Sequence, residues 1–218
     1  MKTKKDLIIP FTWEERRPVF LERFFYLPKQ YDHGAWDEQF VWEETTQPIY
    51  LEICSGNGQW IGEQAQKRPD IYWVALEMDF ARARTIWLKI HREKIPNLYV
   101  VCAEALTFLE HYAPAQSVSH AFVNFPDPWP KRHHAKHRLI KAPFAERLKT
   151  AMKPEGTVTL ATDHAPYRDQ MIQTFNAAPG WASRPISMDP ASYGQSFFAA
   201  LWQGKGKSIH YLRYAHES

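Results

Sequence analysis

The chain has few of the features that mark secreted or membrane proteins. It contains two cysteines, Cys54 and Cys102, which are too few for a disulfide framework, so a reducing cytoplasm is the expected compartment. No apolar run approaches the ~18 residues that a membrane-spanning helix needs. The basic start is followed by an apolar stretch that Pro10 ends, which is too short for an export signal. We therefore expect a cytoplasmic protein without a membrane partner.

A large excess of charge is also missing. Lys and Arg number 27 and Asp and Glu 24 among 218 residues, so the formal net charge is +3. Such a small excess does not indicate a nucleic-acid partner unless the basic residues are clustered. Hydrophobic residues make up 44% of the chain, which is enough for a sizeable core and excludes a disordered tail protein or a disulfide-stapled miniature. The length predicts one domain, or one domain with an extension.

Strand-like and helix-like segments alternate from residue 49 onward. Strands are predicted at 49–53, 72–76, 98–102, 120–124 and 156–161, and helices at 59–67, 80–92, 143–152 and 166–178, with a short helix from Glu104. This alternation predicts a doubly wound α/β fold whose sheet is mostly parallel and carries helices on both faces. Residues 49–218 are expected to form this domain.

The two ends of the chain depart from the alternating pattern. Residues 1–48 have no clean period and are predicted to be an arm packed on the main domain, in which 20–27 is a short helix or an edge strand. Near the other end, the runs 196–202 and 208–214 flank Gly204-Lys205-Gly206-Lys207, which is typical of a hairpin turn. We therefore expect the sheet to end with an antiparallel hairpin strand.

Acidic side chains stand at the ends of the predicted strands, where doubly wound sheets bind their ligands. Glu52 precedes the glycine turn Ser55-Gly56-Asn57-Gly58, and Glu77 follows this turn by about the 20 residues at which an acid accepts both hydroxyls of a ribose. A carboxylate beside the turn repels a pyrophosphate but suits a ligand with an ammonium and a sulfonium group. S-adenosylmethionine has both, so a methyl donor is favoured over a dinucleotide, and a nucleotide-dependent dehydrogenase is the lesser alternative. For any single acid, a solvated loop residue is the competing interpretation.

A proline-rich segment, Asn124-Phe125-Pro126-Asp127-Pro128-Trp129-Pro130-Lys131, follows the fourth predicted strand. Its prolines fix φ and remove backbone donors, so a rigid loop is expected rather than a helix or a strand. Rigid segments at strand ends hold reacting groups. Asp127 is then a fixed carboxylate, and Trp129 is a stacking surface or a packed wall.

A basic run, Lys131–Lys141, comes next. Its eleven residues include five Lys or Arg, three His and no acid. Three interpretations compete: a solvated face, a metal site built from His133, His134 and His137, and a phosphate-binding patch. The cationic neighbours and the lack of an acidic or thiolate partner disfavour a metal, so none is expected. Guanidinium and ammonium groups beside a functional loop favour phosphate binding.

These motifs together resemble the bacterial tRNA (guanine-N7)-methyltransferases. The resemblance covers roughly residues 49 to 214. It is carried by Leu51-Glu52-Ile53 with Gly56-Asn57-Gly58, Glu77, Glu104-Ala105, the segment from Asn124 to Lys131 with its basic run, and Thr162-Asp163 with Tyr167. The Asn-Phe-Pro-Asp-Pro-Trp segment is highly specific, whereas the glycine turn alone is weak. The family implies a Rossmann-like class I methyltransferase fold, S-adenosylmethionine as donor, and methylation of a guanine in the tRNA variable loop.

Site roles follow from the resemblance by position. Donor-binding residues are implied to be Glu52, Ser55, Gly56, Gly58, Glu77, Met78, Glu104, Ala105, Asn124 and Asp127, with Asp127 also the catalytic acid. The implied substrate-binding residues are Lys131, Asp163 and Ser196, and the implied tRNA-binding residues are Arg132, His133, His134, Lys136, His137 and Arg138. A monomer or a homodimer is expected.

Two positions depart from the family's pattern. Cys54 stands where the glycine turn usually begins with Gly, and Ser196-Phe197-Phe198-Ala199 stands where Thr-x-x-Glu is usual, so a hydroxyl is kept but a carboxylate is lost. These departures define the main alternative, a catalytically impaired tRNA-binding paralogue of the same family.

Overall fold

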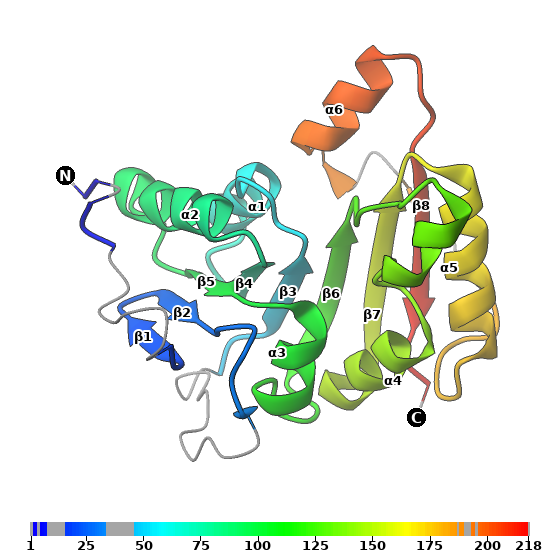
Figure 1. Cartoon of the computed structure of the whole chain (residues 1–218), viewed down its shortest axis with the longest axis horizontal. Helices are drawn as coiled ribbons and strands as arrows, with labels where there is room; N and C mark the ends of the chain where they lie inside the picture. Colours follow the sequence, from blue (N-terminus) through cyan, green and yellow to red (C-terminus); the bar gives the residue numbers. More distant parts are fainter. Residues whose placement is uncertain are drawn as a thin grey trace. The chain divides into compact units, whose positions relative to one another are not determined.

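A computed structural model describes residues 2–3, 5–7, 16–33, 46–186, 188–189, 193–194 and 196–217 (Figure 1). The chain divides into two compact units, Met1–Pro114 and Ala115–Ser218. We refer to them as unit 1 and unit 2 and describe each in turn.

Unit 1 contains a mostly parallel sheet. Its strands are β1 (Val19–Leu21), β2 (Phe24–Tyr26), β3 (Ile49–Ile53), β4 (Tyr72–Glu77) and β5 (Leu98–Cys102), in the order β1-β2-β5-β4-β3. All neighbouring strands in this series run parallel except β1, which is antiparallel to β2. The predicted strands at 49–53, 72–76 and 98–102 are confirmed. All six residues of β4 are buried, which is typical of a parallel strand covered on both faces.

The helices of unit 1 are α1 (Gln59–Lys67), α2 (Phe80–Glu93) and α3 (Ala105–His111), as the sequence predicts. α1 packs on β4, α2 packs on β4 and β5, and the two helices contact each other (Figure 1). α2 is capped at its N-terminus by Asp79, whose side chain accepts a hydrogen bond from the backbone N–H of Arg82. Its buried residues Ala83, Ile86, Trp87 and Ile90 recur at helical spacing, so one stripe of the helix faces the core.

Part of the N-terminal arm belongs to the sheet of unit 1. The segment 20–27, expected as a helix or an edge strand, contains the antiparallel pair β1–β2. β2 pairs in parallel with β5, and the N–H of Leu27 extends this pairing by donating to the carbonyl of Cys102. That residues 1–48 as a whole form an arm packed on the main domain stays a prediction, since residues 1, 4, 8–15 and 34–45 lie outside the described part of the chain.

Unit 2 contains a parallel pair of strands and an antiparallel edge. Its strands are β6 (Val118–Asn124), β7 (Met152–Thr162) and β8 (His210–Ala215), and its helices are α4 (Ala142–Ala151), α5 (Ala165–Ala177), α6 (Phe197–Gly204) and the 3₁₀ helix η2 (Arg132–His137). β6 runs parallel to β7, and β8 runs antiparallel to β7. α5 packs on β7 and β8 and contacts α4. Both predicted strands and both predicted long helices of this region are confirmed.

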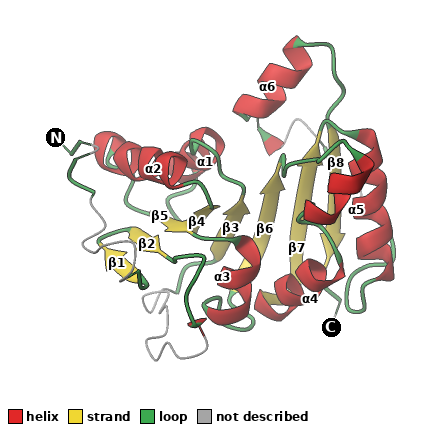
Figure 2. Cartoon of the chain, viewed as in Figure 1, coloured by secondary structure: helices red, strands yellow, loops and turns green. Residues whose placement is uncertain are grey.

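The prediction of a strand at 196–202 is wrong, because these residues begin helix α6 (Figure 2). The expected antiparallel strand near the C-terminus is confirmed as β8, and it pairs with β7. Ser196 explains the helix: its hydroxyl oxygen accepts a hydrogen bond from the N–H of Ala199, as a helix N-cap does. The segment Phe-Phe-Ala-Ala-Leu-Trp can form either structure, and the cap decides in favour of the helix.

The stability of α5 is expected to depend on the protonation of its cap residue, His164. Its ring Nδ1 accepts a hydrogen bond from the N–H of Tyr167, which requires a neutral imidazole. Burial, assisted by the charge of Arg138, lowers the pKa of His164 below its ordinary value. As the pH falls through that ordinary value, near 6.5, the unfolded chain binds the proton first, so the free energy of unfolding decreases.

His164→Asn removes the titration but keeps a capping side chain. We expect its free energy of unfolding to decrease less between pH 7.5 and pH 5.5 than that of the unaltered protein, as measured from urea midpoints at both pH values. An equal decrease in the two proteins would contradict the role of His164.

Candidate functional site

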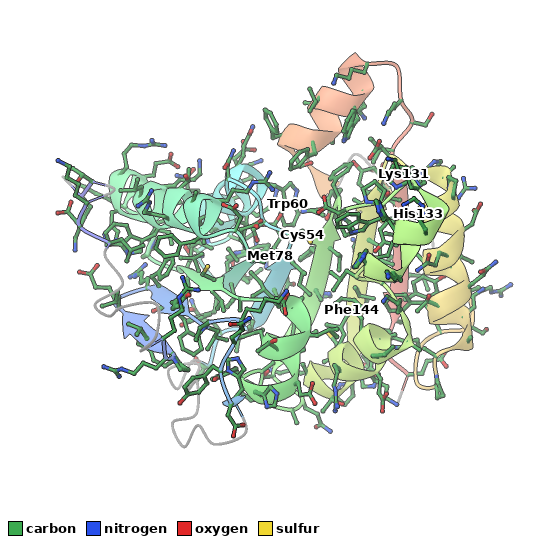
Figure 3. The ribbon with its side chains drawn as sticks, in the orientation of Figure 1. Cys54, Trp60, Met78, Lys131, His133 and Phe144 are labelled. Atoms are coloured by element: carbon green, nitrogen blue, oxygen red, sulfur yellow. The ribbon has the colours of Figure 1, made fainter. Side chains whose placement is uncertain are left out.

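The parallel register of unit 1 brings the ends of three strands to one edge. Ile53 of β3 is opposite Leu76 of β4, and Glu77 of β4 is opposite Cys102 of β5. The residues that follow these strands, which include most of the predicted donor-binding set, therefore share this edge. Figure 3 shows two of them, Cys54 after β3 and Met78 after β4.

Glu77 holds the glycine turn by hydrogen bonds from backbone N–H groups. Its Oε2 accepts from the N–H of Gly56 at 2.7 Å, and its Oε1 accepts from the N–H of Asp79 at 2.9 Å. Burial raises the pKa of Glu77 above its ordinary value, while the bonds from Asp79 and Gly56 oppose this shift. Each carboxylate oxygen has a second lone pair, so this side chain can still accept hydrogen bonds from ligand hydroxyls.

Three residues of the glycine turn have a left-handed backbone conformation. Cys54, Gly56 and Gly58 have φ values of 65°, 56° and 69°. A Cβ at Gly58 would lie 2.8 Å from Cγ1 of Ile86, so glycine lets the turn approach α2 closely. Cys54, which replaces the usual Gly, adopts the left-handed conformation at a cost of about 1–2 kcal/mol. The turn therefore keeps the glycine backbone shape although it carries a thiol.

Two further features of this edge suit a nucleoside ligand with a cationic group. Glu52 is 2% exposed, and the hydroxyl of Ser55 donates to its carbonyl oxygen. Met78 is 67% exposed and Leu106 39% exposed, so apolar side chains follow the ends of β4 and β5 in contact with solvent. Acidic groups and exposed apolar surface thus occur on the same edge.

Glu104 has a partner that the sequence did not indicate. It is the N-cap residue of α3, next to Ala105, and its Oε1 lies 2.8 Å from the Nζ of Lys29. The hydrogen bond to Glu104 raises the pKa of Lys29. Lys29 belongs to the N-terminal arm, whose irregular pattern gave no signal for this ion pair.

The proline-rich loop of unit 2 is fixed at its start by backbone and side-chain contacts. The N–H of Phe125 donates to the carbonyl of Ala161, and the buried Asn124 accepts from the hydroxyl of Tyr193 at 2.5 Å. Asp127 and Trp129 are exposed. Phe125 and Trp129 have positive φ values of 49° and 42°, so the segment is neither a helix nor a strand, as predicted, and its rigidity stays a prediction.

The basic run begins at Lys131, the residue before η2, and continues through this helix. Figure 3 shows the exposed side chains of Lys131 and His133, and Lys136 and His137 are exposed as well. The ring of Trp129 lies 5.8 Å from that of His134 and 5.2 Å from that of His137, between centroids. These two histidines stand three residues apart, and 3₁₀ geometry places such residues on one face. The side chain of Arg132 lies outside the described part of the chain. In that part, no cluster of three His, Cys, Asp or Glu is arranged to hold a metal ion.

Arg138 differs from the exposed residues of the basic run, because it is buried in unit 2. It is 9% exposed, its Nε donates to the carbonyl of Pro128 at 2.7 Å, and its Nη1 donates to Oε1 of Gln170 at 2.7 Å. Two donors of Arg138 are thus used inside unit 2, and this burial disfavours a contact with tRNA, which stays a prediction.

Of the predicted substrate-binding residues, Asp163 has an ion-pair partner and Ser196 caps α6. The Oδ2 of Asp163 lies 2.5 Å from the Nζ of Lys207, and the Asp163 side chain is 10% exposed. The ammonium of Lys207 also lies 3.8 Å from the ring centroid of Trp202. Sequence reasoning missed Lys207 because Gly204-Lys205-Gly206-Lys207 was interpreted as turn chemistry alone.

Comparison with known proteins relates this chain to methyltransferases. The family described as "Putative methyltransferase" matches residues 46–192. The chain is 37% identical to the tRNA (guanine-N(7)-)-methyltransferase of Chlamydia pneumoniae, with 96% of each protein covered. It is 40% identical to the protein of the same name from Chlamydia trachomatis serovar D, with 94% of each covered.

Solved structures show the same fold. The aminoglycoside resistance methyltransferase NpmB1 has a TM-score of 0.55 at 17% identity, and the 16S rRNA methyltransferase KamB has 0.56 at 14% identity. Each match covers 79% of this chain and 89% of the other. At these identities the likeness speaks for the fold alone, and it confirms the predicted Rossmann-like class I methyltransferase sheet. No helix in the described residues is both long and apolar enough to cross a membrane.

The strained conformation of Cys54 leads to a test. Cys54→Gly should raise the free energy of unfolding by about 0.5–1 kcal/mol, because relief of the left-handed strain exceeds the added entropy of glycine in the unfolded chain. Cys54→Ala keeps a Cβ and should bring no gain. Urea unfolding of the three proteins measures this difference. A loss of stability in Cys54→Gly would show that contacts of the thiol outweigh the strain.

Proposed function

The chain belongs to the tRNA (guanine-N(7)-)-methyltransferase family, and from this premise we propose that it transfers a methyl group from S-adenosylmethionine to N7 of a guanine in the tRNA variable loop. The single observation that carries the proposal is the match over 96% of both chains to a protein of that name. The same full-length match favours an active enzyme over the impaired-paralogue alternative. We place the reaction in the cytoplasm.

The residues of unit 1 fit S-adenosylmethionine. Glu52 and Glu77 are only 2% and 5% exposed, so keeping their carboxylates ionised costs desolvation free energy. The ammonium and sulfonium groups of the methyl donor offset this cost. The free lone pairs of Glu77 suit ribose hydroxyls. Met78 and Leu106 offer apolar surface to a base. When bound, this cofactor supplies a methyl group on a cationic sulfur.

The residues of unit 2 serve the guanine. N7 carries a lone pair at neutral pH, so it needs no general base, and the protein has to orient the base and offset the positive charge that moves onto it. Asp127 and Asp163 accept hydrogen bonds from the N1–H and N2–H edge of guanine, which adenine lacks. Because Lys207 holds Oδ2 of Asp163, the guanine edge takes the place of this ammonium or shares the carboxylate with it.

The function itself is tested with labelled S-adenosylmethionine and unmodified tRNA. We expect label in tRNA and 7-methylguanine at one variable-loop position, as mapped by cleavage at the modified base. Binding of tRNA without any 7-methylguanine would support the impaired paralogue instead.

Asp127→Ala and Asp127→Asn are expected to lower kcat by about 10²-fold or more, because neither side chain offsets the charge that develops on the base. The affinity for tRNA should stay within about threefold, since one base contact contributes little beside many phosphate contacts. Asp169→Asn, which alters an exposed carboxylate on α5, is the matched control. Normal turnover of the Asp127 variants would remove this residue from the mechanism.

The basic run is tested by the salt dependence of tRNA binding. If Lys131 and Lys136 contact phosphates, each replacement by Gln should reduce the slope of log K against log salt by about 0.7–0.9. Lys153→Gln, at the opposite end of β7 from the strand's carboxyl end, should leave the slope unchanged. Unchanged slopes in all variants would assign the run to a solvated face.

A further inference from the structure

Arg138 stands in the basic run but is bound inside unit 2. Its guanidinium spans two elements: Nε donates to the carbonyl of Pro128 in the proline-rich loop, and Nη1 donates to Oε1 of Gln170 on α5, both at 2.7 Å. The same group lies 4.9 Å from the ring centroid of Tyr167, also on α5. The planar guanidinium of arginine has donors in fixed directions, so it can bind both acceptors at once, whereas the ammonium of lysine does not match this geometry.

Helix α5 also holds the chain that follows Arg138. The buried hydroxyl of Tyr167 accepts from the N–H of Ile140 at 2.9 Å, and Nε2 of Gln170 donates to the carbonyl of Ile140 at 2.8 Å. Tyr167 is fully buried, so this contact surface is part of the core. α5 is therefore a rigid support for the segment around Arg138, and Arg138 connects that support to the loop.

The prolines fix φ in the loop but deprive it of backbone donors. Pro126, Pro128 and Pro130 have no N–H, so they cannot donate the backbone hydrogen bonds that normally stabilise a turn. The carbonyl that Arg138 binds belongs to Pro128, the residue directly after Asp127. A charge-assisted bond at this carbonyl is short and about twice as strong as a neutral one. It constrains the backbone next to the proposed catalytic carboxylate.

We propose that Arg138 is a positioning residue for methyl transfer, which fixes the Asp127 loop to α5 and makes no contact with tRNA phosphates. This inference rests on the proposed function of Asp127. A displacement of a reacting group by about 1 Å costs on the order of 10²-fold in rate. Loss of the Arg138 connection should therefore lower kcat while leaving the tRNA contacts of the exposed basic residues in place.

The kinetic test compares Arg138→Lys and Arg138→Ala with Lys136→Gln. Both Arg138 variants should lower kcat by about 10- to 100-fold, with KM for tRNA within threefold of normal and an unchanged salt slope. Lys136→Gln should instead change the salt slope. Arg184→Gln, an exposed arginine of the same unit, should leave all these quantities unchanged.

Chemical rescue separates positioning from a general loss of structure. Arg138→Ala leaves a space of the size of a guanidinium ion, so millimolar guanidinium, far below denaturing concentrations, should restore part of the lost kcat. The same concentration of sodium salt should not, and Lys136→Gln should not respond. A merely destabilised protein would lose activity further in guanidinium, and that result would overturn the proposal.

Two other outcomes bear on the proposal. A reduced salt slope with normal kcat in Arg138→Lys would assign Arg138 to phosphate binding and overturn it. If the unaltered protein forms no 7-methylguanine, the proposed function has failed, but hydrogen exchange over residues 125–141 still tests the anchoring. Faster exchange there in Arg138→Lys, and not in Arg184→Gln, supports the connection, and equal exchange overturns it.

Discussion

The hydrogen bonds that the buried carboxylate of Glu77 accepts are the interaction on which the glycine turn of unit 1 depends. Removing a carboxylate from water is costly unless it is hydrogen-bonded, and here backbone N–H groups of Gly56 and Asp79 provide the bonds. The bond to Gly56 requires the turn to fold back toward β4, which in turn requires left-handed residues. Even Cys54 accepts this strained conformation. The acid thus shapes the turn as much as it offers acceptors to a ligand.

In unit 2 a buried cation, Arg138, binds the backbone of a loop, much as the buried carboxylate of Glu77 does in unit 1. A loop with three prolines gains rigidity but loses backbone donors, so its carbonyl groups depend on donors from elsewhere. Arg138 supplies such a donor from the basic run, and α5 holds Arg138 in turn. Arg138 thereby differs from the lysines of the same run, since its guanidinium binds the loop whereas Lys131, Lys136 and Lys141 are exposed.

The spacing of hydrophobic residues and the positions of turn-forming residues were enough to predict the main elements. A buried strand or an amphipathic helix is encoded within a few neighbouring residues. The segment 196–202 was mistaken because a short apolar run fits a strand and a helix equally well, and only the cap at Ser196 distinguishes them. The burial of Arg138 was missed for a different reason. Sequence spacing shows that basic residues are adjacent, but whether one of them turns inward depends on acceptors such as Pro128 and Gln170, which are known only from the fold.

The charge that develops on guanine explains why the predicted site contains carboxylates and no general base. Attack by N7 makes the guanine cationic, so carboxylates that accept from its N–H edge stabilise that charge, whereas a proton acceptor would have nothing to remove. Asp163 is already paired with Lys207, so this 10% exposed carboxylate has a cationic partner before substrate binds. In the proposed complex, Asp163 exchanges the ammonium donor of Lys207 for the N–H donors of guanine, so the carboxylate keeps a hydrogen-bonding partner. Such an exchange lowers the desolvation cost of an ionised Asp163, although guanine becomes positively charged only during the reaction.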